Sequence, residues 1–124
     1  MSELLYNNDT YKIMGICMSV HRELRKDFSE VVYGGALEIE FIHNNINYSR
    51  EKQFDIIYKG NVLPHKYKAD FTIEKKIVLE IKAISNLTNS NIKQILNYLA
   101  VSKLKLGILI NFGEDSLKHK RVIL

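Results

Sequence analysis

Hydrophobic residues recur at helical spacing in three stretches of the chain. The first covers about 11–25, and the second runs from 30 to 43 after Ser29, a residue that can cap a helix N-terminus. Apolar residues at every third or fourth position are typical of a helix with one buried face. A third stretch with this spacing follows Thr88. The pattern therefore predicts three helices.

Between the second and third helices the spacing changes to one that favours strands. The predicted strands are 48–52, 53–58, 67–73, 77–83, and after the third helix 106–111 and 121–124. Only Glu74-Lys75-Lys76 separates 67–73 from 77–83, so these two should form an antiparallel hairpin. Pro64 argues against a central strand at its own position, because proline cannot donate a ladder hydrogen bond.

This order of elements predicts an α/β fold in which a mixed central sheet is flanked by helices. The length of 124 residues suits one hydrophobic core, and no linker divides the chain. We therefore expect a single domain over 1–124, with 1–10 as a flexible N-terminus.

Composition narrows the class of protein. With 46% hydrophobic and 26% charged residues, the chain is typical of a soluble globular domain. No run approaches the roughly 18 apolar residues of a membrane span, and acidic Glu3 with polar 6–9 does not fit a signal peptide. We expect an intracellular, cytoplasmic protein without a membrane partner. Cys17, the single cysteine, has apolar neighbours and is interpreted as a buried thiol rather than a nucleophile.

The net charge of +4 gives a mild bias toward polyanions. The basic residues that cluster late in the chain are Lys103, Lys105, Lys118, Lys120 and Arg121. They are candidates for binding nucleic-acid phosphates, and an ordinary solvated surface is the alternative.

The predicted hairpin carries the candidate chemistry. If its loop is centred on Lys75, Asp70 and Glu80 lie directly opposite each other, and Lys82 is the diagonal neighbour of Asp70. Alternation along the strand assigns the opposite face to Ala69, Phe71 and Ile73.

Opposed carboxylates, with Cβ atoms roughly 5 Å apart, repel each other unless they share a cation. Mg²⁺ is commonly held by one or two carboxylates, with water and phosphate completing its shell. A nearby ammonium can orient the attacking water or offset developing charge. The alternative is a solvated hairpin face with cross-strand ion pairs. The apolar residues around Glu80-Ile81-Lys82 favour a site over that alternative.

From about Ile13 to the C-terminus, the chain resembles the small PD-(D/E)XK proteins named for a GxxExxY motif. The segments that carry this resemblance are Ser29-Glu30-Val31-Val32-Tyr33 with Ala36-Leu37, Tyr67-Lys68-Ala69-Asp70-Phe71, Glu80-Ile81-Lys82-Ala83, Gln94 with Asn97-Tyr98-Leu99, and Leu109-Ile110-Asn111-Phe112-Gly113. The resemblance implies a restriction-endonuclease-like core and a nuclease that uses Mg²⁺, for which Mn²⁺ can substitute.

The resemblance also implies roles for individual residues. It makes Asp70, Glu80 and the backbone carbonyl of Ile81 metal ligands, with Glu30 reaching the metal through water. The catalytic set that it implies is Asp70, Glu80, Lys82, Glu30 and Gln94. From the residues alone, Glu30 could instead be a carboxylate favoured by the helix dipole, and Gln94 a helix surface residue. Tyr33 and Tyr98 are interpreted as core aromatics with a bonded hydroxyl.

One position departs from the motif. Asp27 stands where the family has glycine. If that glycine serves a left-handed backbone conformation, aspartate tolerates the position less well. The departure removes neither an acid nor the lysine.

The leading hypothesis is a metal-dependent nuclease that hydrolyses phosphodiester bonds of DNA or RNA, with DNA preferred. The alternatives are a noncatalytic PD-(D/E)XK-fold module that binds nucleic acid or protein, and a small dimeric junction resolvase. A single copy has little surface for reading bases, so sequence-specific cleavage would need a homodimer or another partner.

Overall fold

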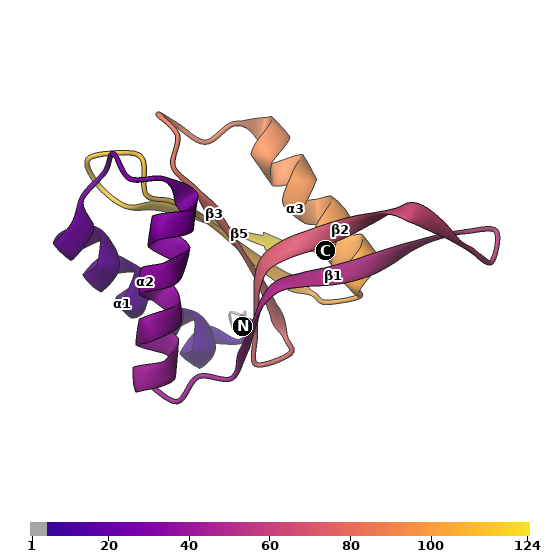
Figure 1. The fold of residues 1–124 in the computed structure, drawn as a ribbon, viewed down its shortest axis with the longest axis horizontal. Coiled ribbons are helices and arrows are strands. Elements are labelled where there is room, and N and C mark those ends of the chain that lie inside the picture. Colours follow the sequence, from indigo (N-terminus) through magenta and orange to yellow (C-terminus); the bar gives the residue numbers. More distant parts are fainter. Residues whose placement is uncertain (1–4) are drawn as a thin grey trace, which may run out of the picture.

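The computed structural model describes residues 5–124, which form a five-stranded sheet with helices on both faces (Figure 1). The elements in chain order are α1 (Asn7–Leu24), α2 (Glu30–His43), β1 (Tyr48–Tyr58), β2 (Asn61–Ile73), β3 (Ile77–Lys82), α3 (Asn89–Ser102), β4 (Leu106–Asn111) and β5 (Lys118–Ile123). The predicted α/β class with a mixed central sheet is confirmed.

The strands lie side by side in their order along the chain, β1-β2-β3-β4-β5. All neighbours are antiparallel except β3 and β4, which are parallel and are connected through α3. Because β3 and β4 are parallel, their carboxyl ends lie at the same edge of the sheet. In Figure 1 the far end of the β1–β2 hairpin extends well beyond the rest of the sheet.

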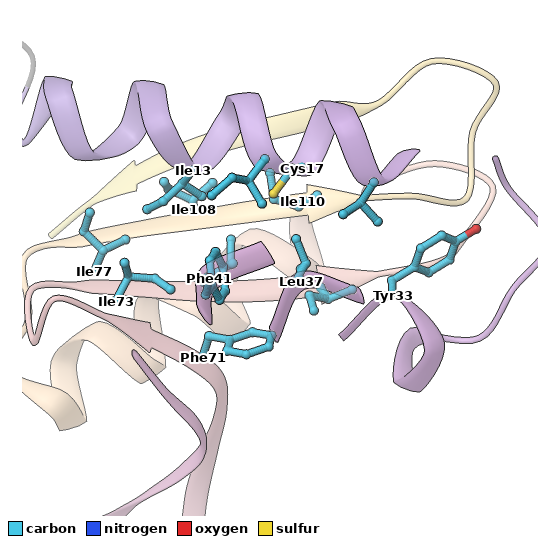
Figure 2. Packing of buried hydrophobic residues seen from close by; sticks show 14 of the residues in the cluster. Ile13, Cys17, Tyr33, Leu37, Phe41, Phe71, Ile73, Ile77, Ile108 and Ile110 are labelled. Carbon is cyan, nitrogen blue, oxygen red and sulfur yellow. The ribbon is translucent and has the colours of Figure 1, made fainter. Parts of the chain in front are cut away.

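Two hydrophobic clusters occupy the two faces of the sheet. On one face, α1 and α2 bury residues such as Cys17 and Leu37 against Phe71 and Ile108 (Figure 2). On the other face, α3 contributes the second cluster, Ile95, Tyr98 and Leu99 against Ala69, Val78, Leu109 and Val122. The sheet is thus covered by helices on both sides, which explains why β3 and β4 are apolar almost throughout.

The N-terminal helix is longer than the pattern indicated. It begins at Asn7, about one turn before the expected start at 11. Part of the segment expected to be flexible, 1–10, is therefore helical, and residues 1–4 lie outside the described residues. Among residues 5–124, no helix is both long and apolar enough to cross a bilayer.

The first two predicted strands are one continuous strand, β1, and β2 begins at Asn61 rather than at 67. Glu51 lies inside this strand although its φ of 56° is in the left-handed region. Pro64 does lie within a strand, but at the register shift after Asp55 and beyond the segment that pairs with β3. Its missing donor therefore removes no hydrogen bond to β3.

The tight connection between β2 and β3 sets their register. Glu74 and Lys75 both take positive φ, 54° and 55°, and the ladder pairs Ile73 with Ile77 and Phe71 with Leu79. The predicted hairpin is confirmed. The predicted alternation is wrong at one place, because Ala69 packs with α3 whereas Phe71 packs on the α1 and α2 side. The strand changes faces at Asp70.

Candidate active site

The backbone ladder between β2 and β3 opens at the two predicted acids. The last regular pair is Phe71 and Leu79, and one further step along the register brings Asp70 opposite Glu80. Here the side chains accept the backbone hydrogen bonds. The backbone N–H of Asp70 donates to Glu80 Oε1 at 3.1 Å, and that of Ile81 donates to Asp70 Oδ2 at 2.7 Å. The two carboxylates are thereby fixed between the strands and close to each other.

Glu80 is a buried acid, with 3% of its surface exposed. The pKa of its carboxyl is raised from 4.5 to about 9, mainly by burial and next by the neighbouring charge of Asp70. The hydrogen bond from the Asp70 backbone and the charge of Lys82 act in the opposite direction and are outweighed. Without a cation, the pair therefore holds a proton at neutral pH.

The predicted lysine and glutamine are in contact. Lys82 Nζ donates to Gln94 Oε1 at 3.0 Å, so α3 holds the ammonium at the end of β3. The carbonyl of Lys82 accepts a hydrogen bond of 2.8 Å from Phe112 N, which ties this strand end to the residue after β4. Gln94 is exposed on α3, and its side chain is the hydrogen-bond partner of the lysine.

A cavity of about 220 Å³ adjoins Asp70 on the α2 side of the sheet. It is lined by Glu30, Val31, Gly34, Arg50, Glu51, Asp70, Phe71 and Ile81. Glu30, in the first turn of α2, shares this cavity with Asp70. Within residues 5–124, however, no three acidic, histidine or cysteine side chains are grouped closely enough to hold one ion directly. A contact of Glu30 with a metal through water stays a prediction, as does the proposed role of the Ile81 carbonyl.

The loop before Glu30 has the conformation that a glycine motif would favour. Asp27 has φ of 89°, in the left-handed region. The hydroxyl of Tyr33 donates to the Arg25 carbonyl and accepts from Phe28 N at 3.3 Å, so it holds the loop from inside. Figure 2 shows this hydroxyl at the edge of the hydrophobic cluster, which fits the interpretation of Tyr33 as a core aromatic with a bonded hydroxyl.

Tyr98 is a second aromatic residue at the site, and it is largely buried beside Tyr67 at a ring distance of 5.1 Å. Burial raises the pKa of its phenol to about 12, and the charges of Glu80 and Asp70 raise it as well. The phenol is therefore neutral throughout the physiological range and can act only as a hydrogen-bonding group.

Two residues at the end of β4 position the site, and sequence reasoning gave them no role. Asn111 is fully buried, and its Oδ1 accepts from Ile84 N at 3.0 Å while its Nδ2 donates to Ile84 O at 3.0 Å. Gly113 lies so close that an added Cβ would be 2.3 Å from the same Ile84 oxygen. An amide at the end of a wholly apolar strand is the signal that could have indicated the contacts of Asn111 with Ile84.

The predicted basic residues are dispersed. Lys118 and Lys120 lie on β5 and pair with Asn111 and Leu109, which places them two strands away from β3, about 10 Å. Lys103 and Lys105 lie at the other end of the sheet, where the first residues of β3 and β4 pair.

The last of the predicted basic residues points inward. Arg121 donates its Nη2 hydrogen to the carbonyl of Leu5, against the start of α1. The structure therefore does not bring the five basic residues together into one surface.

The donor set at the β2–β3 opening suits a hard divalent cation. Asp70 and Glu80 supply two adjacent carboxylates, and Mg²⁺ is commonly bound by one or two carboxylates with water and phosphate as the other ligands. A cation here would also favour the charged form of Glu80, which burial opposes. These residues fit Mg²⁺ without a cage made only of protein ligands.

Comparisons with known proteins bear on this arrangement. The family model described as PD-(D/E)XK nuclease superfamily matches residues 7–122. A solved structure titled SSO0001 is similar, with 25% identity and a TM-score of 0.61. The alignment covers 74% of this chain and 48% of that one, so the chain spans about half the length of that relative.

A second solved structure is an alkaline exonuclease from Laribacter hongkongensis. It has 12% identity and a TM-score of 0.40 over 99% of this chain and 72% of that one. A search of curated proteins gave no match.

Proposed function

This chain belongs to the PD-(D/E)XK nuclease superfamily, and from that membership we propose that it is a Mg²⁺-dependent nuclease whose site is formed by Asp70, Glu80 and Lys82. The observation that carries the proposal is the opening of the β2–β3 ladder. The carboxylates of Asp70 and Glu80 there take the place of backbone acceptors. Lys82 follows two residues after Glu80 on β3. A solvated hairpin face would not bury Glu80.

Each of these residues has a distinct proposed role. Asp70 and Glu80 would hold the metal, and the backbone hydrogen bonds that they accept fix both carboxylates between β2 and β3. Lys82 orients the attacking water and offsets negative charge that develops on the phosphate. Gln94 fixes the position of the Lys82 ammonium through its side-chain oxygen. Mg²⁺, when bound, would polarise the phosphate and lower the pKa of a bound water.

The subfamily is a further part of the proposal. We infer that the chain is a GxxExxY protein in which aspartate has replaced the glycine. Asp27 in a left-handed conformation supports this, as does Tyr33 bonded inside the same loop. Glu30, between the two, lines the cavity next to Asp70.

The substrate is proposed to be nucleic acid, with DNA preferred over RNA and a homodimer required for sequence-specific cleavage. The test is a panel of labelled single-stranded, double-stranded and branched DNA and RNA, each incubated with Mg²⁺, Mn²⁺ or excess chelator. We expect cleavage with either metal and none in chelator. A preference for branched DNA would identify a junction resolvase, and binding without cleavage would identify a noncatalytic module.

Variants connect the activity to the site. Asp70→Asn, Glu80→Gln and Lys82→Met should each lower the cleavage rate by about 100-fold or more. The first two changes weaken the metal site, and the third removes a cation that offsets negative charge developing on the phosphate. Lys93→Met is the matched control for the lysine, because Lys93 is exposed on α3 beside Gln94. It should cleave at the unaltered rate. Full activity of Glu80→Gln, or of the unaltered protein in chelator, would contradict the proposal.

A further inference from the structure

The side chain of Arg50 lies on the wall of the cavity that contains Asp70, and the sequence gave no reason to single it out. It comes from β1, two strands away from Glu80, and reaches across toward α2. Of the described residues that line the cavity, it is the one cation, and three others are the carboxylates Glu30, Glu51 and Asp70. A guanidinium there is not required by the fold of β1, because strand edges usually present such side chains to solvent.

Three contacts hold the guanidinium in place. Nη1 donates to Glu38 Oε1 at 3.0 Å, and Nη2 points to the Val31 carbonyl at 3.4 Å. The group also lies over the ring of Phe71, with Cζ 5.7 Å from the ring centroid. Glu38 is itself fixed, because its other carboxylate oxygen accepts a hydrogen bond of 2.9 Å from the hydroxyl of Tyr48.

Helix α2 makes room for this arrangement at Gly34. A Cβ atom at that position would lie 2.5 Å from Arg50 Nη2 and 3.2 Å from Cζ. The missing side chain therefore lets the guanidinium lie flat against the helix, between Glu38 and the cavity. Glycine inside a helix is unfavourable by roughly 1 kcal/mol relative to alanine, so the position needs a reason, and the guanidinium provides one.

These contacts leave some N–H donors of the Arg50 guanidinium available. A guanidinium has five N–H donors. The bonds that the described residues provide use two of them, one to Glu38 and one long bond to Val31. The side chain is 29% exposed, so its remaining donors can be reached from the cavity. Planar forks of this kind recognise phosphate oxygens more readily than they do neutral groups.

We propose that Arg50 binds a phosphate group of the nucleic-acid substrate in this cavity, next to Asp70, one of the two carboxylates of the proposed metal site. This inference rests on the proposed function for the identity of the substrate. The neighbouring carboxylates repel phosphate on their own, so the contact forms when a divalent cation is bound at Asp70. Arg50 is thus a binding residue that sets where along the strand the phosphate lies.

The test measures binding of a short fluorescein-labelled oligonucleotide by anisotropy, with Ca²⁺ in place of Mg²⁺ and again in chelator. Arg50→Gln should weaken binding in Ca²⁺ by about tenfold or more, the usual loss for a charged hydrogen bond. Arg50→Lys should recover part of the affinity, since it keeps the charge but not the fork. Lys52→Gln, an exposed cation two residues along β1, is the matched control and should change affinity little.

A second oligonucleotide separates a phosphate contact from support of the helix. It carries neutral methylphosphonate linkages, which lack the charged oxygen. The unaltered protein should bind it less tightly than the phosphate form, and Arg50→Gln should lose most of that discrimination. Gly34→Ala, which displaces the guanidinium without removing it, should weaken phosphate binding several-fold and add little to Arg50→Gln. Thermal melts of each variant report any loss of folding.

Several results would overturn the inference. The first is that the unaltered protein does not bind the oligonucleotide in Ca²⁺. The second is that Arg50→Gln loses no more affinity than Lys52→Gln. The third is that Arg50→Gln loses the same affinity for the phosphate and the methylphosphonate oligonucleotides. An equal loss accompanied by a lower melting temperature would assign Arg50 to holding α2 only. If the unaltered protein binds as expected but cleaves nothing with Mg²⁺, the proposed catalysis fails while the phosphate contact stands.

Discussion

Replacing Glu80 with glutamine should make the metal-free protein more stable at neutral pH. The change keeps the size and shape of the side chain, and the amide oxygen can still accept the hydrogen bond from Asp70 N. What it removes is an acid that burial and a neighbouring carboxylate force to take up a proton on folding. The amide group can also donate to the Asp70 carboxylate, as the protonated carboxyl of Glu80 can, so the change keeps this contact too.

The size of the effect follows from the pKa of Glu80, which changes from 4.5 to about 9 on folding. Between these values the folded state binds more protons than the unfolded state, so stability falls as pH rises through this window. The slope is about 1.4 kcal/mol per pH unit for one group. Because pH 7 lies about 2.5 units above the unfolded pKa, the cost there is about 3 kcal/mol. Glutamine does not incur it.

Urea titrations at a series of pH values from about 5 to 8, in chelator, measure this directly. The unaltered protein should lose stability across the series, and Glu80→Gln should lose much less. Glu51→Gln is the matched control, since it removes an exposed carboxylate from the neighbouring cavity wall and should not change the slope. Mg²⁺ should stabilise the unaltered protein more as pH rises, because it binds the deprotonated acid. It should do little for Glu80→Gln.

Equal pH dependence in the unaltered protein and Glu80→Gln would refute the reasoning, because the slope would then come from other groups. So would a Glu80→Gln protein that is less stable than the unaltered one at about pH 7, where relief of the buried charge should be large. A result of that kind would mean that Glu80 is charged and paired in the metal-free fold.

Further predictions concern a loop, a buried thiol and two glycines around the site. Asp27→Gly should raise the free energy of unfolding by about 1 kcal/mol in urea, because glycine adopts φ of 89° without strain, whereas Asp27→Ala should not. Cys17 in the folded protein should resist iodoacetamide at about pH 8, since burial raises its thiol pKa to about 12, and rapid labelling before unfolding would contradict this. Gly113→Ala should destabilise by about 2 kcal/mol, because its Cβ would meet the Ile84 carbonyl. Gly35→Ala, with nothing within 4 Å of the added atom, should stabilise instead.

Local rules account for the parts of the site that could be predicted. A three-residue connection sets the hairpin register, and that register alone places Asp70 opposite Glu80. The family resemblance named Lys82 and Gln94 but did not predict their contact, which joins a strand to a helix across a loop. No spacing rule relates two such positions.

Other features depend on tertiary packing that no local pattern encodes. The change of faces between Ala69 and Phe71 occurs because the ladder opens at Asp70, and an alternating pattern continues through that point unchanged. The sequence around Arg50 is typical of a surface position. Its contact with Glu38 arises only because α2 packs against β1. Lysines close in sequence, such as Lys105 and Lys118, lie at different ends of the sheet because β4 separates them.

The opening of the ladder at Asp70 and Glu80 also has an evolutionary consequence. The two acids accept the hydrogen bonds that hold β2 to β3 at this point, so the integrity of the sheet and the chemistry of the site depend on the same oxygen atoms. Selection for folding alone would therefore retain an oxygen acceptor at both positions, either the carboxylate or its amide, in a descendant that no longer cleaves nucleic acid. The side chains of Lys82 and Glu30 take no part in backbone bonds between strands within the described residues. In such a lineage, decay of the site would become visible first at these two positions.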